Sequence, residues 1–353
     1  MAKKRKTLVD NMQEIIDSGD LEAFKAVFDK CEINATNRGK TTTNILSYKG
    51  LTPAHIQFLI DNGIDVNVDA GLSRPPVAHQ AYSQENLRCL IENGADIDLY
   101  LNGYYGNALH YAALRHRPEE VRNLLACGAS PYVKCGWRNH SALDEALSTC
   151  QNVEIVRTLE IAKLLLEAGV GKTDKSKEYV HIIGERFEFI RPDFNKELVD
   201  EVSAALHELY VFFDVEPVPQ RVVYDGKSRI VVKEDTWQKQ HEELWDMLVP
   251  GRGTANTVQG EVIRIVGKVL HEILDNGGMN WDDEYRKMMK ALVNYFYMAG
   301  GLEAALVEEA CRLAKNVSSR SEERPLERLN ELAVKWVIAN PEPIALGKVE
   351  YKR

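Results

Sequence analysis

Apolar residues in the first half of the chain recur with helical spacing, and the pattern itself repeats. Four segments share one design, in which an apolar stretch and a short polar pair precede a glycine and a turn: FLIDNGIDVN (58–67), CLIENGADID (89–98), NLLACGASPY (123–132) and LLLEAGVGKT (164–173). A degenerate copy, SGDLEAFKAVFDKCEINA, lies upstream at 18–35. Helical segments that recur every 20 to 50 residues or so and end at a glycine indicate a stacked solenoid of repeats.

The clearest copy, at 105–130, also carries a recognisable helix entry. Asn107-Ala108-Leu109-His110 opens it, and the small residues Ala112 and Ala113 follow. This copy resembles the ankyrin repeat, whose period is about 33 residues. The resemblance covers about residues 8–172 and implies some five repeats, of which the first and last are atypical. It also implies that His110 ties its turn to neighbouring backbone.

The stretch GVGKT (169–173) invites comparison with a phosphate-binding loop. That loop requires G-x-x-x-x-G-K-[ST] between a strand and a helix, and Leu166 stands where its first glycine belongs. The residues before it have helical rather than strand periodicity. We therefore interpret GVGKT as the end of the outer helix of the last repeat.

The repeat is lost after Lys177. Apolar spacing predicts an amphipathic helix from about Asp193, and further helices at about 236–248, 256–275, 282–299, 301–316 and 325–339. In RVVYDGKSRIVV (221–232), Asp225-Gly226 lies between β-branched runs, which predicts a hairpin. We therefore expect a mainly α protein: an ankyrin-repeat solenoid at 1–177, then an α-helical C-terminal domain at 178–353 with one small β-hairpin.

Composition is typical of a soluble globular chain, with 44% hydrophobic and 27% charged residues among 353. No apolar run reaches the roughly 18 residues that would span a membrane. The six cysteines are irregularly spaced and form no C-x-x-C pair. This spacing indicates neither a disulfide framework nor a zinc site, so we expect a reducing, cytoplasmic location. The sequence indicates no cofactor and no metal.

Charge is distributed unevenly along the chain. Residues 1–177 carry 22 acidic and 21 basic side chains, a balance of −1, whereas residues 178–353 carry 31 and 23, a balance of −8. Phosphate backbones are bound by clustered Lys and Arg, so this distribution argues against a nucleic-acid partner. It favours a protein partner with a basic face.

We expect the chain to bind a macromolecule rather than to catalyse a reaction. An ankyrin-like array presents its hairpin tips and inner helices as one concave surface. The tips of this chain are rich in the residue types that dominate binding hot spots, and these are the candidate partner-binding residues: Tyr100, Tyr104, Tyr105, Tyr132, Trp137 and Arg138.

Two alternatives remain open at this point. The helix expected after Asn256 could bind an anion at its N-terminus, and an enzyme acting on an anionic or nucleotide ligand would need Asn256, Glu261, Arg264 and His271 in one pocket. Bridging hydrogen bonds between helices would explain the same polar residues. The other alternative is an inhibitor or immunity protein that uses the acidic half. The sequence does not indicate the oligomeric state.

Overall fold

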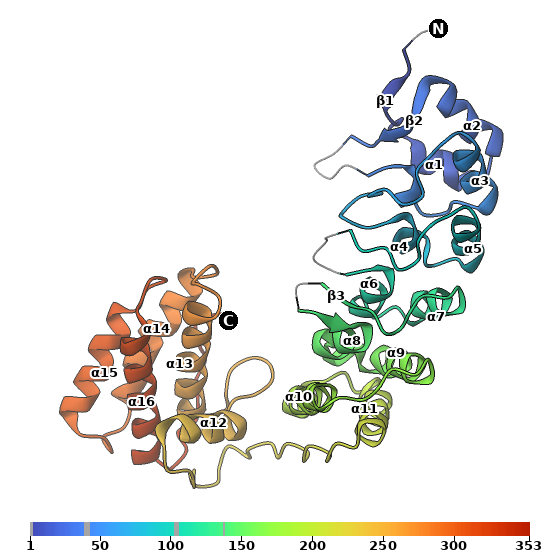
Figure 1. The fold of residues 1–353 in the computed structure, drawn as a ribbon. Helices are drawn as coiled ribbons and strands as arrows, with labels where there is room; N and C mark the ends of the chain where they lie inside the picture. The colour runs from blue at the N-terminus through green and yellow to red at the C-terminus, as the bar shows by residue number, and fades with distance from the viewer. Residues whose placement is uncertain (1–2, 39–42, 102–105, 137) are drawn as a thin grey trace. The chain divides into compact units, whose positions relative to one another are not determined.

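The computed structural model describes residues 3–38, 43–101, 106–136 and 138–353 (Figure 1). The chain divides into two compact units. The first comprises Met1–Glu185 and Glu197–Val218, and the second comprises Arg186–Lys196 and Pro219–Arg353. The helical fold class expected from the sequence is confirmed.

The first unit is built from successive pairs of short helices. Its elements are β1 (Arg5–Thr7), α1 (Met12–Asp17), α2 (Leu21–Lys30), β2 (Cys31–Thr36), η1 (Ile45–Ser47), α3 (Pro53–Asp61), α4 (Pro76–Gln80), α5 (Gln84–Glu92), α6 (Ala108–Leu114), α7 (Pro118–Ala126), β3 (Lys134–Cys135), β4 (His140–Ser141), α8 (Ala142–Thr149), η2 (Asn152–Glu154), α9 (Ile155–Glu167), α10 (Asp174–Ile190) and α11 (Val199–Phe213). Figure 1 shows α4, α6, α8 and α10 in one layer and α5, α7, α9 and α11 in the other.

The pair α6 and α7 begins and ends as the sequence pattern predicts. The side chain of Asn107 accepts a hydrogen bond from the His110 amide at 3.1 Å, which caps the start of α6. The glycine after α7, Gly128, has a φ of +95°, a left-handed conformation that a residue without Cβ adopts at little cost. His110 Nε2 donates to the His140 carbonyl at 2.9 Å. The expected tie between this histidine and neighbouring backbone is therefore confirmed.

The array continues beyond the predicted last repeat. Residues 169–173 do end α9, because Gly169 adopts a φ of +93° after its last turn. The Thr173 hydroxyl then accepts from the Ser176 amide at 3.0 Å and starts α10. Helix α11 packs against α9, and Lys163 pairs with Glu208 across them at 2.7 Å. Helices α10 and α11 therefore form a further pair, which the predicted end of the repeats at 172 omits.

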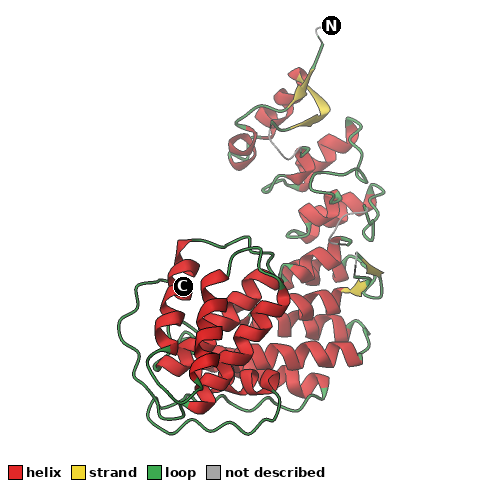
Figure 2. Cartoon of the chain, turned by 90° about the vertical axis from the view of Figure 1, so that its left-hand side faces the viewer, coloured by secondary structure: helices red, strands yellow, loops and turns green. Residues whose placement is uncertain are grey.

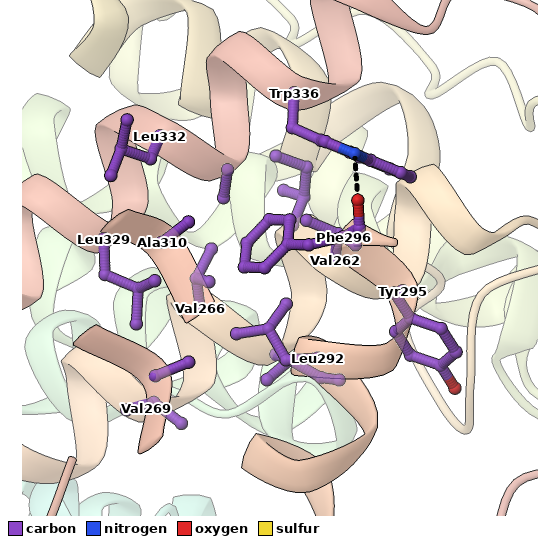
Figure 3. Close-up of a cluster of buried hydrophobic side chains, with 14 of the residues drawn as sticks. Val262, Val266, Val269, Leu292, Tyr295, Phe296, Ala310, Leu329, Leu332 and Trp336 are labelled. Atoms are coloured by element: carbon purple, nitrogen blue, oxygen red, sulfur yellow. Dashed lines mark hydrogen bonds between the residues drawn. The ribbon is translucent and has the colours of Figure 1, made fainter. Parts of the chain in front are cut away.

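The second unit is a helical bundle, whose elements are η3 (Arg191–Asp193), α12 (Trp237–Leu248), α13 (Val258–Leu274), α14 (Asp283–Phe296), α15 (Ala304–Asn316) and α16 (Glu323–Ala339). The helices expected here are confirmed to within a few residues. Helix α13 packs against α12, α14 and α16. Figure 3 shows the core that results, in which Trp336 Nε1 donates to the Phe296 carbonyl at 3.1 Å. Burial of such large apolar side chains stabilises the fold by about 2 kcal/mol each.

The hairpin predicted at 221–232 is wrong. These residues form no strand. The strand pairs of the described chain lie in the first unit (Figure 2), where β1 runs parallel to β2 and β3 runs antiparallel to β4. The Asp225 side chain does shape a turn by accepting from the Lys227 amide at 2.8 Å. The two arms bind other segments instead of each other. Ile230 donates its amide to Pro341, and Arg221 donates to the Phe189 carbonyl.

Candidate functional site

One position of the first helix in successive repeats is left partly exposed. The fourth residues of α4, α6, α8 and α10 form what we call the first-helix row: His79, Tyr111, Glu145 and Lys177. In α4, α6 and α8, the three residues before this position and the two after it are buried. Equivalent positions of stacked helices point the same way, so the row gives the repeat stack one continuous strip of accessible side chains.

Tyr111 is the aromatic member of the row. The guanidinium of Arg74, from the hairpin before α4, lies 4.3 Å from the centre of the Tyr111 ring. A guanidinium over an aromatic face is a favourable cation–π arrangement. Arg74 and Tyr111 join two neighbouring repeats, and together they place a cation and an aromatic ring side by side on the first-helix row.

Glu145 belongs to a half-buried polar cluster. Its carboxylate lies 3.2 Å from Nδ1 of the buried His140, whose Nε2 lies 3.0 Å from the Lys175 ammonium and 3.2 Å from the Tyr179 hydroxyl. An ammonium can only donate, so Nε2 accepts and the proton of a neutral His140 lies on Nδ1. Burial, and then the Lys175 charge, lower the pKa of His140, while burial raises the pKa of Glu145. The cluster joins the start of α8 to α10 through His140, Lys175 and Tyr179.

The remaining members of the row have their own partners. His79 Nε2 lies 3.1 Å from the Gly71 carbonyl, to which it can only donate. Lys177 pairs with Asp214 at 3.3 Å, at the end of α11. The row therefore combines aromatic, acidic and basic side chains.

Half of the hairpin-tip residues predicted from the sequence can be placed in the structure. Tyr100 is 40% exposed, and Arg138 is also exposed. Tyr132 is 64% exposed, yet its hydroxyl donates to the Ala168 carbonyl at 3.0 Å, so it also ties adjacent repeats together. Tyr104, Tyr105 and Trp137 lie outside the described residues. Partner binding by all six stays a prediction.

The four residues proposed for an anionic ligand do not form one site. Glu261 and Arg264 meet in an ion pair whose side chains are 0% and 1% exposed. The Tyr351 hydroxyl donates to Glu261 at 2.7 Å and closes this pair from the outside. His271 lies away from it, with a side chain that is 74% exposed and pairs with Asp275. Glu261 and Arg264 therefore bond to each other and to the segment after α16, and not to a neighbouring helix as the alternative supposed.

The N-terminus of α13 is also covered. The Val258 amide donates to the Ile344 carbonyl at 2.8 Å, and the Thr257 hydroxyl accepts from the Gly260 amide. Asn256 is exposed, and its backbone carbonyl accepts from the Leu346 amide at 3.2 Å. The Val258 amide is used by the segment after α16 and the Gly260 amide by Thr257, so neither amide is available to an anion. Sequence spacing alone could not reveal a partner that lies about 85 positions further along the chain.

The outer helices present a different kind of surface. Between α3 and α5 lies an open groove of about 420 Å³, lined among others by Gln57, Arg88 and Glu92. Across the described ranges, no group of His, Cys, Asp and Glu side chains is arranged to hold a metal ion. Within the same ranges, no helix has the length and apolar character needed to cross a bilayer. The cytoplasmic location expected from the cysteines stays a prediction.

The comparison with protein families agrees with the repeat architecture. A family model of ankyrin repeats in many copies matches residues 90–146, from the end of α5 to α8. Among solved structures, the chain is similar to an ankyrin repeat domain from Acinetobacter baumannii AYE, at 23% identity and a TM-score of 0.37, over 56% of this chain and 96% of that one. The search of curated proteins found no match. With its glycine-ended helix pairs and its family match at 90–146, this chain contains ankyrin repeats.

Proposed function

We propose that the chain is a non-enzymatic binding protein that holds a protein partner on the first-helix row and the adjoining hairpin tips. Ankyrin repeats generally mediate protein–protein interaction, and the matched repeats contribute α6 and the start of α8 to the row. The observation that carries the proposal is the partial exposure of the fourth residue in each of these helices. These side chains are not needed to fill the hydrophobic core, because the residues next to them in α4, α6 and α8 are already buried.

The chemistry of the row suits a mixed, polar interface. Tyr and Arg are enriched at binding hot spots, where a ring or guanidinium fills a pocket of the partner. Tyr111 and Arg74 supply that combination on neighbouring repeats. Glu145 adds an acidic group to the same row, beside His140.

The proposal can be tested by capture followed by mapping. The intact chain would be used to capture proteins from the cells that produce it, and each partner would then be purified and bound in vitro. Hydrogen–deuterium exchange of the complex should show protection in α6, α8 and the hairpin tips. Protection confined to the outer helices α5, α7 and α9, or to the second unit, would refute binding through the first-helix row.

A further inference from the structure

The groove between α3 and α5 exists because short side chains lie where these two outer helices pack (Figure 1). Ala54 of α3 is exposed. Cys89 of α5 is half-buried, and its Sγ lies 3.8 Å from the Pro53 carbonyl and 3.9 Å from Gln57 Oε1. Neither Ala54 nor Cys89 is long enough to fill the space, which measures about 420 Å³. A groove of this size can take a few side chains from one face of a partner.

One wall of the groove carries a line of charges. Glu85, Arg88 and Glu92 all line it, and they stand three and four residues apart on α5. That spacing places them on one face of the helix, over about 10 Å of its length. The wall therefore presents a negative, a positive and a negative charge in order. We call these three residues the α5 charge row.

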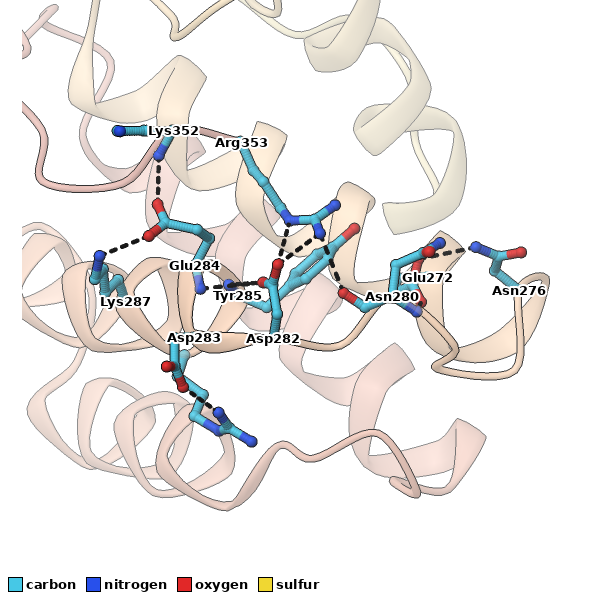
Figure 4. A network of polar contacts seen from close by, with 11 residues as sticks. Glu272, Asn276, Asn280, Asp282, Asp283, Glu284, Tyr285, Lys287, Lys352 and Arg353 are labelled. Atoms are coloured by element: carbon cyan, nitrogen blue, oxygen red, sulfur yellow. Dashed lines mark hydrogen bonds and ion pairs between the residues drawn. The ribbon is translucent and has the colours of Figure 1, made fainter.

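The α5 charge row has no partner of its own among the described residues. All three of its residues are exposed, and none of them makes an ion pair or a side-chain hydrogen bond with another described residue. Charged residues three positions apart do pair elsewhere: Glu119 pairs with Arg122 on α7, and Glu284 with Lys287 on α14 (Figure 4). The charges of the row are therefore available to a group outside the chain.

The order of these charges determines which partner fits. In a helix, two bases seven residues apart, with an acid three or four residues after the first, lie on one face. They span the same length as Glu85, Arg88 and Glu92, so each can face a charge of opposite sign. A helix with a like charge at any of the three positions would be repelled, and this makes the row selective.

We propose that the groove between α3 and α5 is a second docking surface, which binds a helical segment of a partner protein with a basic, an acidic and a basic side chain in that spacing. The two bases would pair with Glu85 and Glu92, and the acid would pair with Arg88. Short side chains between them would contact Ala54 and Cys89. This surface lies on the outer helices and does not depend on the first-helix row.

The test uses the full-length protein and defined probes, which are fluorescein-labelled, alanine-based peptides stapled as helices. Two probes carry Lys at i and i+7 with Glu at i+3 or at i+4, which suits parallel or antiparallel docking. A third has the same composition with Glu at i+2, on the opposite side of the helix. Fluorescence anisotropy at low ionic strength, where exposed ion pairs are screened least, should show saturable binding of one of the first two probes. The third should bind on the order of tenfold more weakly.

Exchanging the charges of the protein tests the assignment of each residue. The triple variant Glu85→Lys, Arg88→Glu, Glu92→Lys presents the opposite order of charges. It should lose the matched probe and bind the charge-reversed one, which carries Glu, Lys and Glu at the same positions. The single variant Arg88→Glu should bind the matched probe on the order of tenfold more weakly. Arg122→Glu, on α7 outside the groove, should bind it as wild type.

A second measurement locates the probe. The matched probe should slow alkylation of Cys89 by iodoacetamide, followed by mass spectrometry. It should not slow alkylation of Cys127, which is half-buried at the end of α7. Melting curves would establish that each variant is folded. The proposal would be overturned if neither matched probe bound saturably, if the third bound equally well, or if folded Arg88→Glu and the triple variant kept the preference of wild type.

Discussion

Arg264 donates from Nε and Nη2 to the two carboxylate oxygens of Glu261, three residues earlier on α13, at 2.8 and 2.6 Å. Tyr351 bonds to the same carboxylate, and the hydroxyl of Tyr295 lies 3.1 Å from that of Tyr351. The pair thus fastens the segment after α16 to the centre of the second unit. Burial, and then the bond to Glu261, raise the pKa of Tyr351, so this hydroxyl stays protonated and keeps donating.

The first prediction is that breaking this pair destabilises the second unit strongly. In Glu261→Ala the buried guanidinium of Arg264 would keep its charge without a carboxylate partner. Such a loss costs about 3–5 kcal/mol of unfolding free energy. Urea unfolding followed by circular dichroism measures it. Tyr351→Phe is the matched control and should cost only about 1 kcal/mol, since it removes one hydrogen bond. If Glu261→Ala lowered the free energy of unfolding by less than about 1 kcal/mol, the Glu261–Arg264 pair would not be what anchors this segment.

The second prediction concerns acid. Burial, and then the charge of Arg74, lower the pKa of His79 from 6.5 to about 4. The unfolded chain therefore takes up a proton below pH 6.5 that the folded chain takes up only near pH 4. The stability from neutral His79 is complete above pH 6.5 and is lost as the pH falls toward 4, by at most about 3 kcal/mol.

His79→Gln keeps a donor for the Gly71 carbonyl and does not titrate. Unfolding free energies at pH 7 and pH 4.5 should therefore differ less in this variant than in wild type. Other buried histidines contribute equally to both proteins and cancel in the comparison. The same pH dependence in both proteins would mean that His79 is not held neutral by the fold.

The third prediction follows from the additional helix pair. A fragment of residues 1–172 lacks α10 and α11 and so exposes the surface of α9 on which α11 packs. It should melt at a lower temperature than a fragment of residues 1–218, and bind more of a dye that reports exposed apolar surface. Differential scanning calorimetry of the two fragments makes the comparison. Equal melting temperatures would indicate that the repeat array ends at residue 172.

The glycine signal explains both what could be predicted and what could not. Helices α3, α5, α7 and α9 each end at a left-handed glycine, so the spacing of those glycines predicts the repeats. Helix α11 ends instead at Asp214, which adopts a φ of +53°. An aspartate in that conformation gives no glycine signal, so the sixth pair could not be recognised by the same pattern.

The other errors arise from contacts between distant segments. The β-branched residues of 221–232 suit a strand, but β-propensity depends on context. No hairpin forms here because Arg221 and Ile230 donate hydrogen bonds to Phe189 and Pro341 instead. Glu261 and Arg264 are three residues apart, a spacing that places them on one face of a helix. It could not predict that Tyr351, 90 residues later, would bury them. The first-helix row was missed because His110 was used only to identify the repeat. The next residue, Tyr111, was not considered as part of a surface.

The central claim is that the first-helix row carries partner binding, and the affinity of one aromatic variant tests it most directly. Isothermal titration calorimetry would compare Tyr111→Ala with Arg122→Ala, a change of an exposed residue on the outer helix α7. Truncation of a central interface aromatic can cost about 2 kcal/mol or more. The account predicts that Tyr111→Ala weakens partner binding on the order of tenfold or more while its melting temperature holds, and that Arg122→Ala binds as wild type. Full-strength binding by a well-folded Tyr111→Ala protein would contradict it.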